Sequence, residues 1–475
     1  MPIDRARLHR ALNPKTVVVV GDKGPEFRWL SNCSEFTGRL FSVQLDEKEI
    51  PGIEAKGVTN FRSLMDVPGE VDLVICAVPR NVTPFIVADA VKKQVGGLAM
   101  YTSGFVETTE PLGIELQGKI AAMANEAGMP LIGPNCLGVY NRHLGVKFAD
   151  AQEKGEGGAI SIVSQSGANG SGLVLGAQRM GVAVRRAISI GNAAVLNEAD
   201  YLQYLLEDPE TPAIAMYLEG IRSGRRFFEL LREGTKRKPV IIWRGGRTRA
   251  GARAVQSHTA SLASDDAIWM SLVRQCGAIS TESLEDTVET MAALVLTPKS
   301  SKKNLALIAS TGGQSVAITD QFERAGFEVP ELSQASYERL GAFFVTIGGS
   351  YRNPFDASST IGRESDNLAK ILEILSEEPA IEGVAIELQA RDSEKGTERL
   401  DGMLELLRQY RSKTSHPVIG LVPTGGAMGE QEAVGARARI HVAKAGFPAF
   451  SSFRAGAQAL GRVRAYYEEL EARTK

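Results

Sequence analysis

The sequence has few cysteines and no long apolar run. The four cysteines, Cys33, Cys76, Cys136 and Cys276, stand far apart, with no Cys-x-x-Cys pair and no cluster of cysteine and histidine. This spacing excludes a disulfide framework and the common zinc sites, and it indicates reduced thiols in the cytoplasm. No apolar segment suits a signal peptide or approaches the roughly 20 residues that span a bilayer. We therefore expect a cytoplasmic protein without a membrane segment.

The sequence also lacks an excess of charge of either sign. Its formal net charge is −2, and 43% of its residues are hydrophobic. Proteins that bind nucleic acids through the phosphate backbone normally carry a clear basic excess, so we expect no nucleic-acid partner. The 475 residues exceed what one hydrophobic core usually organises and predict about three domains.

The first part of the chain alternates apolar strands with helical segments, which predicts a doubly wound parallel sheet. The glycines after the first strand lack the spacing G-x-G-x-x-G, so a nicotinamide-dependent oxidoreductase is a minor alternative. Ligands of such a sheet bind beyond the carboxyl ends of its strands, although each end also fits an ordinary turn. The predicted strands are 16–20, 40–43, 71–78 and 97–101, and the polar turns are 21–25, 78–80, 102–105 and 133–136.

A second series of strands begins at residues 158–163. This strand leads through Ser164-Gln165-Ser166-Gly167 into a helix predicted from residue 171. Main-chain N–H groups and the positive end of the helix dipole make such a turn suitable for phosphate. Glu219 follows the predicted strand 213–218, where its carboxylate could orient an imidazole; a solvated surface glutamate is the alternative.

His258 lies in the segment 244–264, which is rich in Gly, Ala, Arg, Ser and Thr. This composition offers little apolar surface, so we expect a mobile loop. Imidazole titrates near neutrality, and its neutral form is a nucleophile toward phosphorus. A solvated histidine is the alternative.

A third unit repeats the opening of the second. The strand 305–309 leads through Ser310-Thr311-Gly312-Gly313 into a helix, which indicates an internal duplication. Further strands are predicted at 383–387 and 417–422, and a closing helix at 455–473.

Five short motifs together resemble the α subunits of the NDP-forming acyl-CoA synthetases, relatives of succinyl-CoA synthetase. They occur in the order of that family: Gly133-Pro134-Asn135-Cys136-Leu137-Gly138, Ser164-Gln165-Ser166-Gly167, Tyr217-Leu218-Glu219-Gly220, Ser257-His258-Thr259 and Asn353-Pro354-Phe355-Asp356.

The resemblance implies an α/β protein with a Rossmann-like CoA-binding domain at 1–146 and two flavodoxin-like parallel-sheet domains. The first of these, at 147–298, would carry the phosphohistidine, and the second would span 304–475. It implies that His258 is phosphorylated, that Glu219 stabilises the phosphohistidine, and that Ser164, Gln165, Ser166 and Gly167 bind its phosphate. The implied contacts with coenzyme A are Gly21, Lys23, Val78, Pro79, Ser103, Gly104, Asn135 and Cys136; no metal ligand is expected in this chain.

The implied reaction is acyl-CoA, phosphate and ADP giving acid, CoA and ATP, reversibly. No stretch resembles an ATP-grasp domain, so the resemblance implies a β subunit of that kind, a hetero-oligomer, and Mg²⁺ held mainly by the partner. The acid would be a small carboxylic acid. A non-catalytic CoA-binding or regulatory module is the alternative function.

Three further residues lie in the predicted CoA-binding region. Asp22 and Glu26 place carboxylates near the expected CoA phosphates. Cys136 could be a nucleophile, but a buried, inert thiol is the simpler interpretation.

Overall fold

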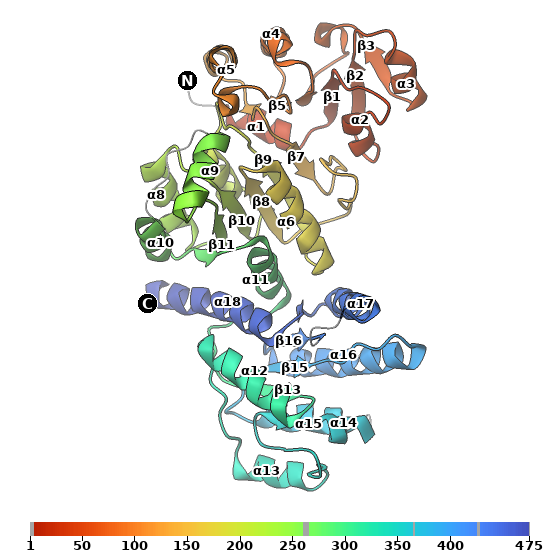
Figure 1. The fold of residues 1–475 in the computed structure, drawn as a ribbon, viewed down its shortest axis with the longest axis vertical. Helices are drawn as coiled ribbons and strands as arrows, with labels where there is room; N and C mark the ends of the chain where they lie inside the picture. The colour runs from red at the N-terminus through yellow and green to blue at the C-terminus, as the bar shows by residue number, and fades with distance from the viewer. Residues whose placement is uncertain (1–3, 260–265, 364–365, 425–427, 475) are drawn as a thin grey trace. The chain divides into compact units, whose positions relative to one another are not determined.

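The computed structural model describes residues 4–259, 266–363, 366–424 and 428–474. The chain forms two compact units, one of Met1–Gln178 with Ala183–Leu284 and one of Arg179–Val182 with Glu285–Lys475. The first unit holds two sheets and the second holds one (Figure 1). Among the helices in the described ranges, none has the length and apolar character to cross a membrane.

The first sheet has the strand order β3-β2-β1-β4-β5-β6, with parallel pairing throughout. This is the order of dinucleotide-binding folds, in which ligands bind near the point where the order reverses, here between β1 and β4. All five residues of β1 are buried, as the run of four valines predicts. The elements are α1 (Arg5–Leu12), β1 (Thr16–Val20), α2 (Arg28–Asn32), β2 (Arg39–Val43), α3 (Ile50–Ala55), β3 (Thr59–Phe61), η1 (Leu64–Asp66), β4 (Leu73–Cys76), η2 (Arg80–Val82), α4 (Thr83–Lys92), β5 (Gly97–Met100), η3 (Val106–Thr108), α5 (Pro111–Glu126) and β6 (Leu131–Ile132).

The second sheet has the order β12-β11-β10-β8-β9-β7. Its five parallel strands, taken along the chain, lie in the flavodoxin-like order 2-1-3-4-5, and β7 adds an antiparallel edge by pairing with β9. The elements are β7 (Gly138–Asn141), β8 (Ile160–Ser164), α6 (Gly167–Arg179), β9 (Val184–Ser189), α7 (Glu198–Glu207), β10 (Ile214–Leu218), α8 (Gly224–Gly234), β11 (Val240–Arg244), α9 (Arg249–Thr259), α10 (Asp266–Gln275) and β12 (Ile279–Thr281).

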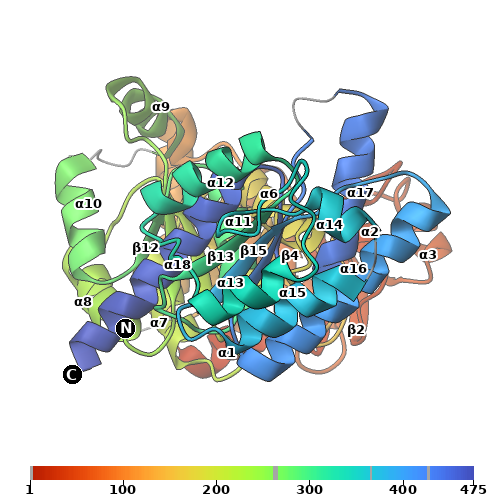
Figure 2. The same cartoon turned by 90° about the horizontal axis from the view of Figure 1, so that it is seen from below.

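The sheet of the second unit repeats this order as β14-β13-β15-β16-β17. Alternate residues of its strands face opposite layers: Ile308 and Val418 pack with α15 and α16, whereas Ile419 and Leu421 lie against Gly456 of α18 (Figure 2). The elements are α11 (Leu284–Leu296), β13 (Leu305–Ala309), α12 (Gly312–Arg324), α13 (Gln334–Gly341), β14 (Phe355–Asp356), α14 (Ser358–Arg363), α15 (Asp366–Glu377), β15 (Gly383–Glu387), α16 (Glu394–Thr414), β16 (Val418–Leu421), α17 (Glu430–Lys444), β17 (Ala449–Phe450) and α18 (Phe453–Thr474).

The predicted fold class, one Rossmann-like and two flavodoxin-like sheets, is confirmed. The prediction of a loop over 244–264 is wrong in part, because α9 occupies Arg249–Thr259. The Thr248 hydroxyl accepts the N–H of Gly251 at 3.0 Å and caps the helix, whose Ala and Arg residues favour helical conformation. Val255 of α9 is buried. Helix α6 also begins at Gly167, four residues before the predicted start.

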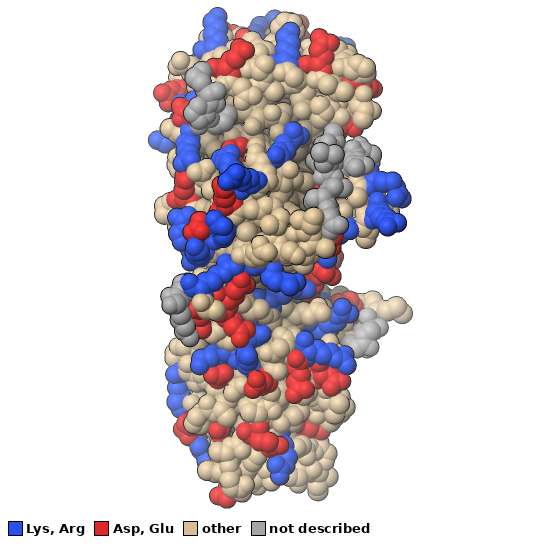
Figure 3. Space-filling view, turned by 90° about the vertical axis from the view of Figure 1, so that its left-hand side faces the viewer, with Lys and Arg blue, Asp and Glu red and all other residues tan. Residues whose placement is uncertain are grey.

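Acidic and basic side chains are interspersed on the face of the molecule shown in Figure 3.

A buried arginine links the second sheet to helix α1 of the first unit. Arg186 on β9 is fully buried; its guanidinium pairs with Asp208 and donates to Asn13 Oδ1, at the end of α1, at 2.7 Å. Thr211 also donates to Asp208, at 2.7 Å. Removing one member would leave the other charge buried without its partner, which is more costly than losing an exposed pair.

Replacing the buried cation tests this contribution. We expect Arg186→Met to lower the free energy of unfolding by about 3–5 kcal/mol, because Asp208 would lose its counter-ion. Arg5→Met, which breaks the exposed pair with Glu207, is the control and should cost less than about 1 kcal/mol. Urea unfolding followed by circular dichroism measures both. Equal effects of the two substitutions would contradict the assigned role of Arg186.

Candidate active site

The predicted phosphate-binding turn connects β8 to α6. Ser164 Oγ accepts the N–H of Ser166 at 3.2 Å, and Ser166 Oγ accepts the N–H of Asn169 at 3.3 Å. Gly167 begins the helix, where the first main-chain N–H groups have no partner within the helix itself. Because α6 has 13 residues, its dipole adds a positive potential at this end. The turn can therefore receive an anion.

The Gln165 side chain links this turn to the end of β10. Its Oε1 accepts the N–H groups of Glu219 and Gly220, the latter at 3.0 Å, and its Nε2 donates to Gly220 O at 2.9 Å. A buried amide with these bonds fixes the backbone on which the Glu219 carboxylate is mounted. The predicted phosphate residues and Glu219 thus lie at one edge of the sheet, at the carboxyl ends of the neighbouring strands β8 and β10.

Tyr217 orients the carboxylate of Glu219. Its hydroxyl donates to Glu219 Oε1 at 3.2 Å, and its ring lies 4.4 Å from that of Trp243 on the neighbouring strand β11. Burial and the nearby Glu219 charge raise the pKa of Tyr217, so the phenol keeps its proton. A Cβ at Gly245 would lie 2.5 Å from the Tyr217 hydroxyl, which explains why the residue after β11 is glycine.

His258 lies in the last turn of α9 and not in a loop. This helix contacts η3, which belongs to the first sheet's domain, within the same unit. The side chains of residues 256–259 and the whole of 260–265 lie outside the described residues. The predicted pairing of His258 with Glu219 therefore stays a prediction.

The predicted CoA contacts follow β1, β4, β5 and β6, which are adjacent in the first sheet. Hydrogen bonds connect each of three turns to the next one. Thr102 Oγ1, after β5, donates to Val78 O, after β4, at 2.6 Å, and the N–H of Asn135, after β6, donates to Thr102 O at 3.0 Å. Arg80 donates to Gly104 O at 2.7 Å. The structure therefore brings together all eight predicted positions at one edge of the sheet, where Lys23, Pro79 and Ser103 are exposed, Gly21, Val78, Gly104 and Asn135 are partly exposed, and Cys136 is buried.

Asp22 turns away from this edge. Its carboxylate is buried and accepts the N–H groups of Trp29 and Leu30, at 3.0 and 2.9 Å. Glu49 in turn accepts the N–H of Gly24 at 2.8 Å. Carboxylates of the protein itself thus accept the main-chain N–H groups of Lys23, Gly24, Trp29 and Leu30, whereas the Glu26 side chain is exposed.

Cys136 matches the interpretation as a buried thiol. Its Sγ contacts the carbonyl oxygens of Met100 and Ile132, at 3.4 and 3.5 Å. Burial raises the pKa of this thiol to about 12, so the thiolate that a nucleophile needs is disfavoured.

Asn192, to which the sequence analysis gave no role, connects the CoA-side turns to the second sheet. Its buried Nδ2 donates to Glu107 Oε2 at 2.6 Å and to Gln117 Oε1 at 3.0 Å, and its Oδ1 accepts from Asn135 at 3.4 Å. The N–H of Asn192 donates to Pro134 O at 2.9 Å. A Cβ at the preceding Gly191 would lie 2.2 Å from Pro134 O, so only glycine allows this approach.

The network continues on both sides of Asn192. Burial alone would raise the pKa of Glu107, but hydrogen bonds from Asn192 and from the N–H groups of Gly104 and Phe105 outweigh it and lower that pKa. Glu107 is therefore an ionised acceptor beside the predicted CoA contact Gly104. On the other side, Arg222 donates to Asn192 O at 2.7 Å. The only sequence signal for this network is the position of Gly191-Asn192 after a strand.

Known families match both parts of the first unit. Residues 15–142 match the CoA binding domain, and residues 157–294 match the succinyl-CoA ligase like flavodoxin domain. A solved structure of a dinucleotide-forming acetyl-coenzyme A synthetase 1 of Ca. Korarchaeum cryptofilum, in complex with phosphate and ADP, superposes with a TM-score of 0.82 at 25% identity, covering 98% of each chain.

Relatives of known name match most of the sequence. An ADP-forming acetate–CoA ligase I of Archaeoglobus fulgidus is 30% identical over 79% of this chain and 54% of its own, so the chain spans about half of that relative. The subunit alpha of an ADP-forming acetate–CoA ligase II of Pyrococcus furiosus is 32% identical over 76% of this chain and 78% of its own. The chain belongs to the family of ADP-forming acyl-CoA ligases, and the relatives that are named as single subunits are α subunits.

Proposed function

We propose that the chain is the α subunit of an ADP-forming acyl-CoA synthetase with His258 as phosphoryl carrier. The observation that carries the proposal is the bridge from the phosphate-binding turn to Glu219 through Gln165. This bridge joins an anion site to the buried carboxylate of Glu219, which can accept a hydrogen bond from an imidazolium. Helix α9 of the same unit carries His258. A non-catalytic CoA-binding module would need only the first sheet and no such arrangement.

In the proposed reaction, inorganic phosphate attacks the thioester carbonyl of an acyl-CoA. The C–S bond breaks, and CoA and an acyl phosphate form. The neutral imidazole of His258 then attacks phosphorus and the carboxylate of the acid leaves. Glu219 stabilises the positive charge of the phosphoimidazole, and the N-terminus of α6 binds its phosphoryl oxygens. ADP finally takes the phosphoryl group from His258 to give ATP, and each step is reversible.

Coenzyme A would bind at the carboxyl edge of the first sheet. Exposed Lys23 and Arg28 offer cations for its phosphates, and Arg28 is held by the Tyr101 hydroxyl at 3.4 Å. Because Asp22 and Glu49 accept the N–H groups of Lys23 and Gly24, we expect the side chains of Lys23 and Arg28, and not these two N–H groups, to contact the phosphates. The thiol end would lie at the turn of Asn135 and Cys136.

The remaining components come from a partner. We propose a β subunit of the ATP-grasp type that binds ATP or ADP with Mg²⁺, because two relatives are named as the subunit alpha of an ADP-forming ligase, which implies a further subunit. Within the described residues of this chain, no cluster of three or more His, Cys, Asp or Glu side chains could hold a metal ion. The substrate would be a small carboxylic acid, and the free, buried cysteines support a reducing compartment such as the cytoplasm.

Phosphorylation of His258 is the direct test of the proposed function. With an ATP-grasp partner and γ-labelled ATP·Mg²⁺, we expect acid-labile, base-stable label on the wild-type chain, because phosphohistidine has that stability. His258→Asn should abolish the label, and His143→Asn, at an exposed ion pair with Glu156, is the matched control and should retain it. Absence of label on the wild-type chain with a competent partner would refute the synthetase and favour the CoA-binding module.

The bridging amide gives a second prediction. Gln165→Ala removes the acceptor of the Glu219 and Gly220 N–H groups and shifts the carboxylate, so we expect phosphorylation of His258 to slow about 10- to 100-fold. Gln203→Ala, which loses a surface hydrogen bond to Glu207, should leave the rate unchanged. Rapid-quench measurement of labelled protein gives both rates. A wild-type rate in Gln165→Ala would show that the bridge does not position Glu219.

A further inference from the structure

Arg222 is an exposed arginine that the structure holds in place beside the proposed site. It follows Glu219 by three residues, in the loop between β10 and α8. Its guanidinium donates to Asn192 O at 2.7 Å, which is the only hydrogen bond of this side chain with the described residues. Within the same ranges it forms no ion pair. A guanidinium carries five N–H donors, so Arg222 keeps its charge and most of its donors for a ligand.

The main chain of Arg222 is fixed by a buried carboxylate. Glu198, the first residue of α7, is fully buried, and its Oε1 accepts the N–H groups of Arg222 and Ser223, at 2.7 and 3.2 Å. Asn197 Nδ2 also donates to Ser223 Oγ at 3.3 Å. Because hydrogen bonds to a buried carboxylate are strong, this loop is held in one conformation. The guanidinium therefore has less freedom to lose when it binds a ligand.

The position of Arg222 follows from the strand order of the second sheet. Its loop follows β10, Asn192 follows β9, and β8 lies between these two strands. The two loops therefore meet near the carboxyl end of β8, where the phosphate-binding turn begins at Gln165. Asn192 is bonded in turn to Pro134 and Asn135, the turn at which the CoA thiol would lie. Arg222 thus stands between the CoA side and the phosphate side of the proposed reaction.

Nearby arginines already pair with carboxylates. Arg226, in the first turn of α8, pairs with Asp200 at 2.6 Å. Arg80, at the edge of the first sheet, pairs with Glu110 at 2.6 Å. Arg222 differs from both because its charge is available to an anion.

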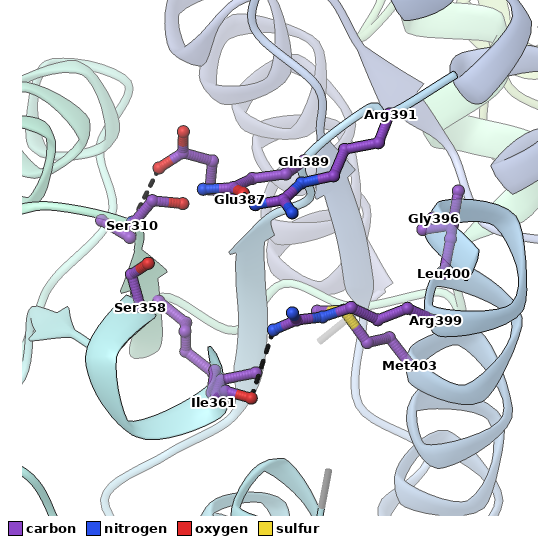
Figure 4. A pocket seen from close by; sticks show the side chains of 12 residues that line it. Ser310, Ser358, Ile361, Glu387, Gln389, Arg391, Gly396, Arg399, Leu400 and Met403 are labelled. Carbon is purple, nitrogen blue, oxygen red and sulfur yellow. Dashed lines mark hydrogen bonds between the residues drawn. The ribbon is translucent and has the colours of Figure 1, made fainter. Parts of the chain in front are cut away.

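The second flavodoxin-like sheet offers a comparison. The loop after its strand β15 also carries an arginine, Arg391, which donates to Gln389 Oε1 at 3.1 Å within the same loop (Figure 4). Arg222 reaches instead to Asn192, in the loop after another strand. A link between two loops is therefore not a general property of an arginine at this place in the fold.

The proposed reaction has one anion that must visit both sides. This is the phosphoryl group, which is inorganic phosphate when it attacks the thioester, then part of the acyl phosphate, and finally bound to His258 beside Glu219. Guanidinium binds phosphoryl oxygens in bidentate geometry. The carboxylates of Glu107 and Glu219 flank the region, so a phosphoryl dianion needs a cation there.

We propose that Arg222 binds the phosphoryl oxygens of the acyl phosphate and holds this group for attack by His258. This role rests on the proposed function and adds a catalytic residue to it. In this step a nitrogen of the imidazole forms a bond to phosphorus, the bond from phosphorus to the acyl oxygen breaks, and the acid leaves as a carboxylate with that electron pair. The guanidinium offsets the negative charge of the phosphoryl oxygens, which would otherwise repel an electron-rich nucleophile.

Acetyl phosphate carrying labelled phosphorus tests this role without coenzyme A or the partner. It should phosphorylate His258 of the purified full-length chain and release acetate. We expect Arg222→Met to lower the second-order rate constant of this labelling roughly 10- to 100-fold, because a charge-assisted contact is lost. Arg225→Met, which removes an exposed arginine paired with Glu229, is the matched control and should react at the wild-type rate.

Two further variants separate anion binding from support of the loop. Arg222→Lys keeps the positive charge, whereas Arg222→Gln keeps only a neutral N–H donor for Asn192 O. We expect the lysine variant to react with acetyl phosphate about tenfold faster than the glutamine variant, because only a cation attracts the phosphoryl oxygens. Equal rates of these two variants would overturn the proposal and leave Arg222 a structural residue.

Labelling by ATP·Mg²⁺ and the partner separates this role from the proposed function itself. Every Arg222 variant should accept label from ATP at a near wild-type rate, since that step involves no acyl phosphate. Absence of ATP label on the wild type would refute the proposed function and this role with it. Where ATP labels the wild type, three results would each overturn only the role of Arg222: no label from acetyl phosphate on the wild type, a wild-type rate with acetyl phosphate in Arg222→Met, or equal losses of both labels in that variant.

Discussion

The arrangement of the first unit depends on the hydrogen bonds of one buried amide, that of Asn192. The side chain holds Glu107 and Asn135, which belong to turns of the first sheet, while its own backbone ends a strand of the second. Such bonds are strong because they are shielded from water, and costly to leave unmade. Gly191 makes the approach sterically possible. Through Arg222 the same residue reaches the loop that follows Glu219. The CoA-side turns and the phosphate-side turn are thereby held in one compact body.

The two flavodoxin-like sheets share one strand order and differ at the residue that follows the first strand. In the first unit, Gln165 closes the gap with three hydrogen bonds and fixes a carboxylate beside an anion-binding helix. In the second unit, Ser310 stands at this position, and its N–H donates to Glu387 Oε2, at the end of β15, at 2.8 Å. Both sheets present the carboxyl ends of their strands at one edge, and the side chains at that edge determine what can bind there.

Local sequence signals predict the sheets well because buried parallel strands are short, continuous apolar runs; β1, β13 and β15 lie at the predicted residues. The turn at Ser164–Gly167 is likewise evident from its small and polar residues. Composition alone does not predict α9, because this helix depends on its cap at Thr248 and on the burial of Val255. The role of Asn192 could not be found locally, because the partners of its side chain lie 57 to 85 residues away in the sequence. The division into domains at 1–146, 147–298 and 304–475 stays a prediction.

The central claim is that Asn192 aligns the CoA side of the first unit with its phosphate side. The most direct test compares two rates in wild type and Asn192→Ala. The first is the rate at which ATP and the partner subunit phosphorylate the chain. The second is the rate at which the phosphorylated chain loses its phosphoryl group when acid and CoA are added. We predict a near wild-type rate for the first and a loss of about tenfold or more for the second, because only the second needs both sides aligned. Equal losses in both rates, or no loss in the second, would contradict the account.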